Sequence, residues 1–189
     1  VLDIINEPTA AAICYGVQQG FLTTTGESQQ RELILIYDLG GGTFDVTLME
    51  IEGSNYKALA TAGDVYLGGV DFDRRIVDYM AEEFEMEFDV DPRKDDSAYQ
   101  VLLQKASEAK HALSARDEMS IFFAHDGNRQ RINLTREKFE FLTEDLIDRT
   151  ILTTNKVLRE AKTEYSDMTR LMLVGGSTRM PKVQEILER

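Results

Sequence analysis

Three consecutive glycines, Gly40 to Gly42, stand between two carboxylates in the stretch YDLGGGTFD at residues 37–45. They follow Leu33–Ile36, a run of four apolar residues that is typical of a buried strand. Glycine loses more backbone freedom on folding than any other residue, so three in a row weaken both helices and strands. The stretch therefore predicts a turn between two strands. Two explanations stay open: an ordinary tight hairpin, or a backbone that must come very close to a ligand.

Two aspartates flank this turn and add a chemical reason for a ligand. Asp38 ends the first predicted strand and Asp45 begins the second, so both are expected near the mouth of the turn. Carboxylates beside a glycine-rich anion cradle suit a hard cation such as Mg²⁺, which would bridge them to phosphate, usually through water. In an ordinary hairpin the same aspartates would instead cap the turn amides.

Two other glycine pairs lie near helix starts. The turn GGST at residues 175–178 lies between an apolar strand at 171–174 and a helix opened by Pro181. A strand, a glycine turn and a helix N-terminus present free N–H groups and the positive end of a dipole to an anion. The spacing is neither that of a P-loop nor Gly-x-Gly-x-x-Gly, and plain strand-to-helix packing explains it as well. The glycines at 68–69 are a weaker signal, because Asp71 as a helix N-cap accounts for them.

The helix predicted at 97–115 carries two different faces. At 100° per residue its apolar residues gather on one side and its polar residues on a second stripe. The polar stripe is either a solvated face or the wall of a pocket, with groups suited to a sugar and a flat base. The apolar residues are Leu102, Ala106, Ala109 and Leu113, and the polar ones are Ser107, Lys110, His111 and Ser114.

The remaining pattern predicts a mixed chain of helices and strands without internal repeats. Periodicity, turn residues and caps define each element. We expect a short helix at 8–16 ended by Gly16, a loop at 18–31 and a meander of antiparallel strands at 33–38, 43–52 and 56–62. A helix at 71–88 and a solvated acidic connector at 88–96 follow. The chain then forms a hairpin at 120–124 and 129–134, with His125 at its solvated tip, and a helix capped by Thr135 that runs, with a possible break, to about residue 165.

Composition narrows the classes of protein. The net charge of −13 argues against a nucleic-acid binder, because phosphate contacts need clustered Lys and Arg. The single cysteine, Cys14, fits a reducing compartment, and its apolar neighbours predict a buried thiol. No apolar run reaches the roughly 18 residues of a membrane span and no signal peptide is visible, so we expect a cytoplasmic protein. The first residue is Val1 rather than Met, and we expect the chain to be a piece of a longer protein.

Four motifs in this order and spacing resemble one family: the seventy-kilodalton heat-shock chaperones of the DnaK type. They are NEPTAAA at 6–12, YDLGGGTFDV at 37–46, LGGVDFD at 67–73 and LVGGSTRMPKVQ at 173–184. The resemblance extends over essentially the whole chain and implies an α/β fold, the actin-like ATPase or ribonuclease-H-like fold. It also implies that the chain is the second lobe of the ATPase domain. That lobe would comprise an inter-lobe helix and loop (1–31), a sheet-and-helix subdomain (32–66 plus 144–189) and an inserted helical-plus-hairpin subdomain (67–143).

The resemblance also implies roles for individual residues. Asp38 would hold Mg²⁺ through water, and Glu7 and Asp45 would position the attacking water or a K⁺ ion. The implied catalytic set is Glu7, Asp38, Thr43 and Asp45, and the implied nucleotide-binding set is Gly40, Gly41, Gly42, Thr43, Gly68, Gly69, Lys110, His111, Ser114, Gly175, Gly176, Ser177 and Arg179.

The implied cofactors are ATP or ADP with Mg²⁺, and K⁺ as a further ion. The implied partners are a nucleotide-exchange factor and a J-domain co-chaperone in the full protein, and unfolded polypeptide bound through a domain that this chain lacks. Neither nucleic acid nor a membrane is among them.

Four positions depart from the family pattern. Ser107 stands where the family usually has a glutamate that holds the ribose hydroxyls, which implies weaker binding of the ribose. Val70 stands where an acidic residue is common, and His111 where many members have arginine. Asp3 replaces a usually basic residue, which puts the usual co-chaperone contact in doubt.

The first lobe, with its own glycine hairpin and a lysine that meets the transferred phosphate, is not in this sequence. Phosphoryl transfer needs electrostatic stabilisation from both sides of the γ-phosphate. We therefore expect weak nucleotide binding and essentially no hydrolysis. Two other functions stay open: a docking module for a nucleotide-exchange factor with little nucleotide affinity of its own, and a lobe of an actin-like small-molecule kinase.

Overall fold

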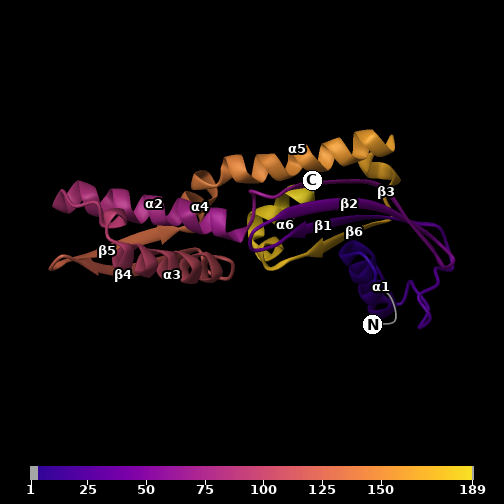
Figure 1. Ribbon diagram of the computed structural model, residues 1–189, viewed down its shortest axis with the longest axis horizontal. Helices are drawn as coiled ribbons and strands as arrows, with labels where there is room; N and C mark the ends of the chain where they lie inside the picture. The colour runs from indigo at the N-terminus through magenta and orange to yellow at the C-terminus, as the bar shows by residue number, and fades with distance from the viewer. Residues whose placement is uncertain (1–3, 189) are drawn as a thin grey trace. The chain divides into compact units, whose positions relative to one another are not determined.

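The computed structural model describes residues 4–188, and these divide into two units (Figure 1). Unit one comprises residues 4–66 and 149–178, and unit two comprises residues 67–148 and 179–188. Helix α5, Glu144–Ala161, has residues in both. The subdomain boundaries expected from the family stay a prediction, and Asp3 lies outside the described residues.

A four-stranded sheet in the order β3-β2-β1-β6 forms the centre of unit one (Figure 1). The central strand β1 pairs antiparallel with β2 and parallel with β6, and β2 pairs antiparallel with β3. The predicted meander is therefore confirmed. The strands are β1 Glu32–Leu39, β2 Phe44–Glu52, β3 Asn55–Asp64 and β6 Arg170–Val174.

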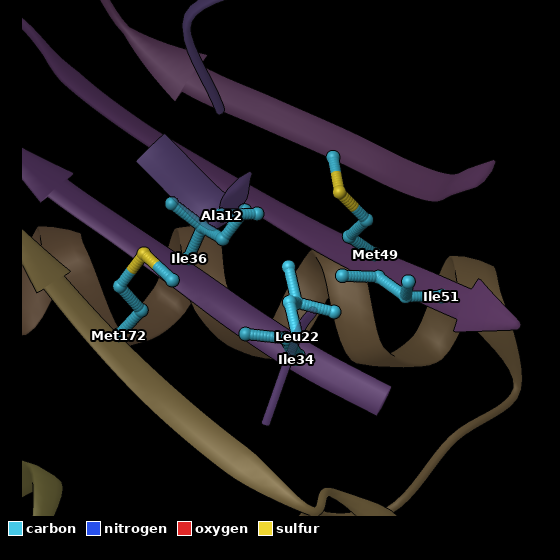
Figure 2. Close-up of a cluster of buried hydrophobic side chains, with 7 residues drawn as sticks. All are labelled: Ala12, Leu22, Ile34, Ile36, Met49, Ile51 and Met172. Atoms are coloured by element: carbon cyan, nitrogen blue, oxygen red, sulfur yellow. The ribbon is translucent and has the colours of Figure 1, made fainter. Parts of the chain in front are cut away.

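Helix α1, Glu7–Gln19, contributes to the core on one face of this sheet. Figure 2 shows seven buried side chains gathered there: Ala12, Leu22, Ile34, Ile36, Met49, Ile51 and Met172. Ile34 and Ile36 are two apart on β1, as the alternation of side chains along a strand requires. The other side of β1 is also buried, and there the Tyr37 hydroxyl bonds to Thr150 of α5. A strand that is buried on both faces has apolar residues at successive positions, which explains the apolar run Leu33–Ile36.

The end of α1 differs from the prediction. The helix continues past Gly16 to Gln19 and ends at Gly20, which has the left-handed φ of +76° that is common at helix C-termini. Gly16 is instead a packing residue, because a Cβ there would lie 2.3 Å from the Cδ1 atom of Leu22. The prediction that Gly16 ends the helix was therefore wrong.

The prediction of a buried Cys14 was also wrong, because the thiol is exposed. Ala12 and Gly16, four residues apart, form the buried side of α1. Cys14 lies two positions from each of them, about 200° around the helix, so it faces away from the sheet. Apolar neighbours in sequence do not share a helix face, and the prediction overlooked this.

Unit two contains two long helices and a β-hairpin. In the hairpin, residues 118–125 pair antiparallel with residues 128–135, and a two-residue turn at Asp126–Gly127 joins the two strands. The predicted break in the long helix is confirmed: α4 ends at Leu142 and α5 begins at Glu144. The elements are α2 Gly69–Phe88, η1 Pro92–Lys94, α3 Asp96–Leu113, β4 Glu118–His125, β5 Asn128–Thr135, α4 Arg136–Leu142, the first part of α5, and α6 Pro181–Leu187.

The start of α2 was assigned to the wrong residue. Gly68 is the N-cap, and Asp71 lies in the first turn, where its carboxylate accepts a hydrogen bond from the Gly68 N–H over 2.8 Å. Thr135, by contrast, caps α4 as predicted, since its hydroxyl accepts from the Lys138 N–H over 3.1 Å.

Two segments that are predicted to be solvated are packed against other residues in the structure. His125 is half-buried at the end of β4, and its ring lies 6.3 Å from that of Phe84 and 6.5 Å from that of Phe123. The connector after α2 includes the short helix η1, in which Pro92 is buried and Arg93 forms an ion pair with Asp91 over 2.9 Å. Tertiary packing and charge pairing therefore order both segments.

No helix within residues 4–188 is long and apolar enough to cross a membrane.

Candidate nucleotide site

The glycine turn joins β1 to β2 in unit one. Asp38 lies opposite Asp45 in the strand pairing, and the Gly40 N–H donates to the Thr43 carbonyl over 3.0 Å to close the turn. The prediction that both aspartates lie at the mouth of the turn is therefore confirmed.

Gly41 and Gly42 have no structural reason to be glycine within the described chain. Neither has a positive φ, and a Cβ added to either would meet nothing within 4 Å. Both are exposed. Since neither backbone conformation nor internal packing requires glycine here, the turn presents bare backbone to whatever approaches it.

The second glycine segment lies against the first. β6 runs parallel to β1, with Val174 opposite Asp38, so the residues after β6 arrive beside the turn. The Ser177 hydroxyl donates to the Gly40 carbonyl over 3.0 Å. Ligands of open α/β sheets bind at such carboxyl ends of parallel strands, although this sheet is mixed.

The two glycines of this segment have different explanations. Gly175 has a φ of +88°, and a Cβ there would lie 2.3 Å from the Leu39 carbonyl oxygen. Gly176 has open space around it. A short 3₁₀ helix, η3 at Gly176–Arg179, follows directly, and α6 begins only at Pro181. The predicted helix start at Pro181 is therefore confirmed, and η3 forms the connection between the glycines and that helix.

Three carboxylates border a cavity of about 400 Å³ beside the turn in unit one. Burial raises the pKa of Asp38, and repulsion from Glu7 and then from Asp45 raises it further. A cation at this position would relieve that repulsion, so the donor set fits a hard divalent ion. No three His, Cys, Asp or Glu side chains within residues 4–188 are placed to hold a metal ion by themselves, so further ligands would have to be water or phosphate oxygens.

Sequence reasoning missed several residues around this cavity. Asn6, Thr47 and Thr61 also line it, and the hydroxyls of the two threonines are hydrogen-bonded to each other. Gly63 on β3 makes room for Asp45, because a Cβ at Gly63 would lie 2.5 Å from the Asp45 Oδ1 atom. A glycine in the interior of a strand often marks such a close approach, so the sequence pattern could have identified Gly63.

Several predicted nucleotide-binding residues belong to unit two. Gly68 and Gly69 begin α2 and are buried. Lys110 of α3 is buried as well: its ammonium donates to the Gly69 carbonyl over 2.7 Å and lies 2.9 Å from the Asp73 Oδ1 atom.

The apolar face predicted for α3 is confirmed, but its polar stripe is not uniform. Lys110 packs inside unit two, whereas His111 is exposed and Ser114 is half-buried. The Ser114 hydroxyl lies 3.4 Å from the Lys110 carbonyl oxygen, to which it donates. Arg179 is exposed. Whether these residues join those of unit one in a single site stays a prediction.

Comparison with known proteins gives one consistent result. The sequence model of the family described as "Hsp70 protein" matches residues 1–189. The chain is 44% identical to the chaperone protein DnaK of Deinococcus deserti and 44% identical to that of Deinococcus proteolyticus. Each comparison extends over 100% of this chain and 30% of the relative, so the chain spans about a third of the length of these relatives. The mixed sheet with helices on its faces is consistent with a lobe of the actin-like ATPase fold of this family. The chain belongs to the Hsp70 family of chaperones.

Proposed function

We propose that this chain is the second lobe of an Hsp70 ATPase domain and supplies one half of its nucleotide site. The bare backbone of Gly41 and Gly42 beside the Asp38–Asp45 pair is the observation that carries the proposal. Exposed glycines that need neither a left-handed φ nor a close contact are unusual unless another group must come close.

The phosphates would lie along the turn at Gly40–Thr43, with the N–H groups of Gly41 and Gly42 and the Thr43 hydroxyl as donors, because the Gly40 N–H already closes the turn. Bound Mg²⁺ would neutralise phosphate charge during transfer. Asp38 would hold the water ligands of that ion, since its half-buried carboxylate is already crowded by negative charge. Glu7 and Asp45, which line the same cavity, would orient the attacking water or accept K⁺.

In unit one, Gly175, Gly176 and Ser177 would contact the adenosine. The roles of Gly68, Gly69, His111, Ser114 and Arg179, which belong to unit two, stay those that the family resemblance implies. Lys110 would act by positioning rather than by direct contact, because Asp73 and the Gly69 carbonyl already occupy its ammonium. Ser107, half-buried on α3, offers only a neutral hydroxyl to the ribose. We therefore expect weaker binding than with a carboxylate at that position.

Titration calorimetry with Mg-ADP tests the phosphate site. Gly41→Ala and Gly42→Ala are expected to fold as stably as the parent chain, because the added methyl group meets nothing. They should nonetheless weaken nucleotide binding at least about tenfold, a change of roughly 1.4 kcal/mol.

Gly53→Ala is the matched control, because Gly53 also has open space but a φ of +59° in a turn away from the site. It should cost stability and leave the binding heat per folded molecule unchanged. Unchanged ADP affinity in both Gly41→Ala and Gly42→Ala would contradict the proposed phosphate site.

Single-turnover hydrolysis of ATP tests the second part of the proposal. The chain contains one glycine hairpin with its carboxylates, so the γ-phosphate would be stabilised from one side only. We expect no turnover above the rate without protein, and a rate near that of a complete ATPase domain would overturn this expectation.

A second candidate function is docking of a nucleotide-exchange factor. Large apolar side chains are exposed on unit two, with Met86 74% exposed on α2 and Phe122 62% exposed on β4. If the exchange factor binds while Mg-ADP produces no heat, this second function is favoured over nucleotide binding.

A further inference from the structure

A groove of about 340 Å³ lies within unit two, away from the carboxylates of the nucleotide site. Residues of α4, of the first part of α5 and of α6 line it. None of its residues belongs to the sets assigned to nucleotide binding.

The groove has an exposed apolar part. Phe141 is 70% exposed at the end of α4, and the other apolar residues of the wall are the half-buried Ile186 and the buried Ile147. A phenylalanine that is this exposed next to a hollow is more informative than a scattered surface leucine. The Lys138 ammonium lies 5.6 Å from the centroid of the Phe141 ring, so the ring already attracts a cation.

The rest of the groove is negatively charged. Glu140, Glu144 and Asp148 line it, and none of the three forms an ion pair within residues 4–188. The one basic residue in the wall, Lys182, is paired with Glu185 over 3.1 Å. The unpaired charge in the wall of the groove is therefore that of the three carboxylates, with the Lys138 ammonium as a single cation beside the Phe141 ring.

Two of the three carboxylates lie about one helical turn apart on the same helix. Glu144 and Asp148 are four residues apart on α5, which corresponds to about 6 Å along a helix. Side chains on the same side of an extended peptide are about 6.6 Å apart, because the rise per residue is about 3.3 Å. Two basic residues at alternate positions of an extended segment therefore match this pair of carboxylates.

We propose that this groove binds an extended, positively charged polypeptide segment with basic residues at alternate positions and a bulky apolar side chain that contacts Phe141. Charge complementarity selects the basic residues, and the exposed Phe141 ring with the half-buried Ile186 selects the apolar one. The proposal does not depend on the nucleotide site.

Fluorescence anisotropy with a labelled peptide of the pattern Leu-Ser-Lys-Ser-Lys, whose leucine and two lysines lie on the same side when it is extended, tests it on the 189-residue chain. The paired substitution Glu144→Gln with Asp148→Asn is expected to weaken binding about tenfold. The matched control, Glu52→Gln with Glu82→Gln, removes two exposed carboxylates elsewhere and should change affinity less than about twofold.

Phe141→Ala tests the apolar contact, with Phe122→Ala as its control, because both rings are largely exposed and neither change should unfold the chain. We expect about fivefold weaker binding for the first and no change for the second.

Three results would overturn the proposal. Equal weakening by both charge pairs would mean attraction to the net negative charge alone. Binding that is unchanged by Phe141→Ala would remove the apolar contact. Sedimentation showing a dimer that Phe141→Ala dissociates would assign the groove to a second copy of this chain.

Discussion

The hydroxyl of Ser177 donates a hydrogen bond to the carbonyl of Gly40 over 3.0 Å, although the two residues are 137 positions apart. This bond links the glycine turn after β1 to the glycine segment after β6. Ser177 is buried and Gly40 half-buried, so the bond is partly shielded from water. The position of the proposed phosphate-binding turn relative to the proposed adenosine-binding segment therefore depends on this hydrogen bond.

Ser177→Ala should therefore lower both stability and nucleotide affinity. The loss of one hydrogen bond costs about 1 kcal/mol, and the Gly40 carbonyl would be left without this donor. Urea denaturation and Mg-ADP calorimetry measure the two effects. Ser54→Ala, at an exposed serine in the β2–β3 turn, is the control and should change neither. Full ADP affinity in Ser177→Ala would mean that the link is not needed for binding.

Gly175 and Gly176 are neighbours with opposite expected tolerances. Gly175→Ala combines a φ of +88° with a Cβ placed 2.3 Å from the Leu39 carbonyl oxygen, so it should lower the free energy of unfolding by roughly 2 kcal/mol or more. Gly176→Ala meets nothing within 4 Å and should stay within about 0.5 kcal/mol of the parent chain. Thermal denaturation compares the two variants, and equal losses would contradict the packing described for Gly175.

Lys110→Met should be among the most destabilising single changes in unit two. It removes one partner of a buried ion pair and leaves the Asp73 carboxylate uncompensated, which costs about 3–5 kcal/mol. The double variant Lys110→Met with Asp73→Leu should recover much of that loss, because no buried charge remains. Denaturant titration of the single and double variants checks this. A double variant as unstable as the single one would indicate that the hydrogen bond to the Gly69 carbonyl, and not the ion pair, matters most.

Asp38 should make stability depend on pH in the direction opposite to that of a typical ion-paired aspartate. Its folded-state pKa is raised above the ordinary 3.8 by burial and by repulsion from Glu7 and Asp45. The folded state therefore holds this proton more tightly than the unfolded state, and the free energy of unfolding falls as pH rises from 3.8 through the raised pKa.

Asp38→Asn removes this effect, so the variant should be more stable than the parent chain near pH 7 and lose that advantage as the pH is lowered toward about 4. Thermal melts in EDTA across this range provide the measurement. Mg²⁺ should raise the melting temperature of the parent chain more than that of Asp38→Asn, because the ion offsets the same repulsion. A variant that is less stable than the parent near pH 7 would contradict the assigned cause.

Local patterns in the sequence were sufficient for much of the fold. The run Leu33–Ile36 predicted a buried strand, and the turn residues on either side predicted the meander that the pairing of β1, β2 and β3 confirms. The helical period predicted α2 and α3 to within about two residues, and Thr135 marked the start of α4. These successes rest on side-chain period and turn chemistry, which act over a few residues.

The errors lie where contacts between distant segments outweigh local preference. Local pattern predicts that Gly16 ends α1, but Gly16 is needed where the helix packs against Leu22, and the helix ends at Gly20. Apolar neighbours predict a buried Cys14, but helix rotation turns it to solvent. Helical period predicts Lys110 on one polar stripe with His111, yet the neighbouring helix α2 supplies the partners that bury it.

The candidate site also combines residues that the sequence identifies with contacts that only the fold decides. Sequence alone identified the glycines and aspartates, because glycine freedom and carboxylate charge belong to the residues themselves. The division of those glycines into Gly175, which the fold requires, and Gly41, Gly42 and Gly176, which it does not, depended on atoms far away in the chain. The pairing of Ser177 with Gly40 and the clearance that Gly63 gives Asp45 likewise follow from sheet order, since a register across strands brings together residues that no local pattern relates.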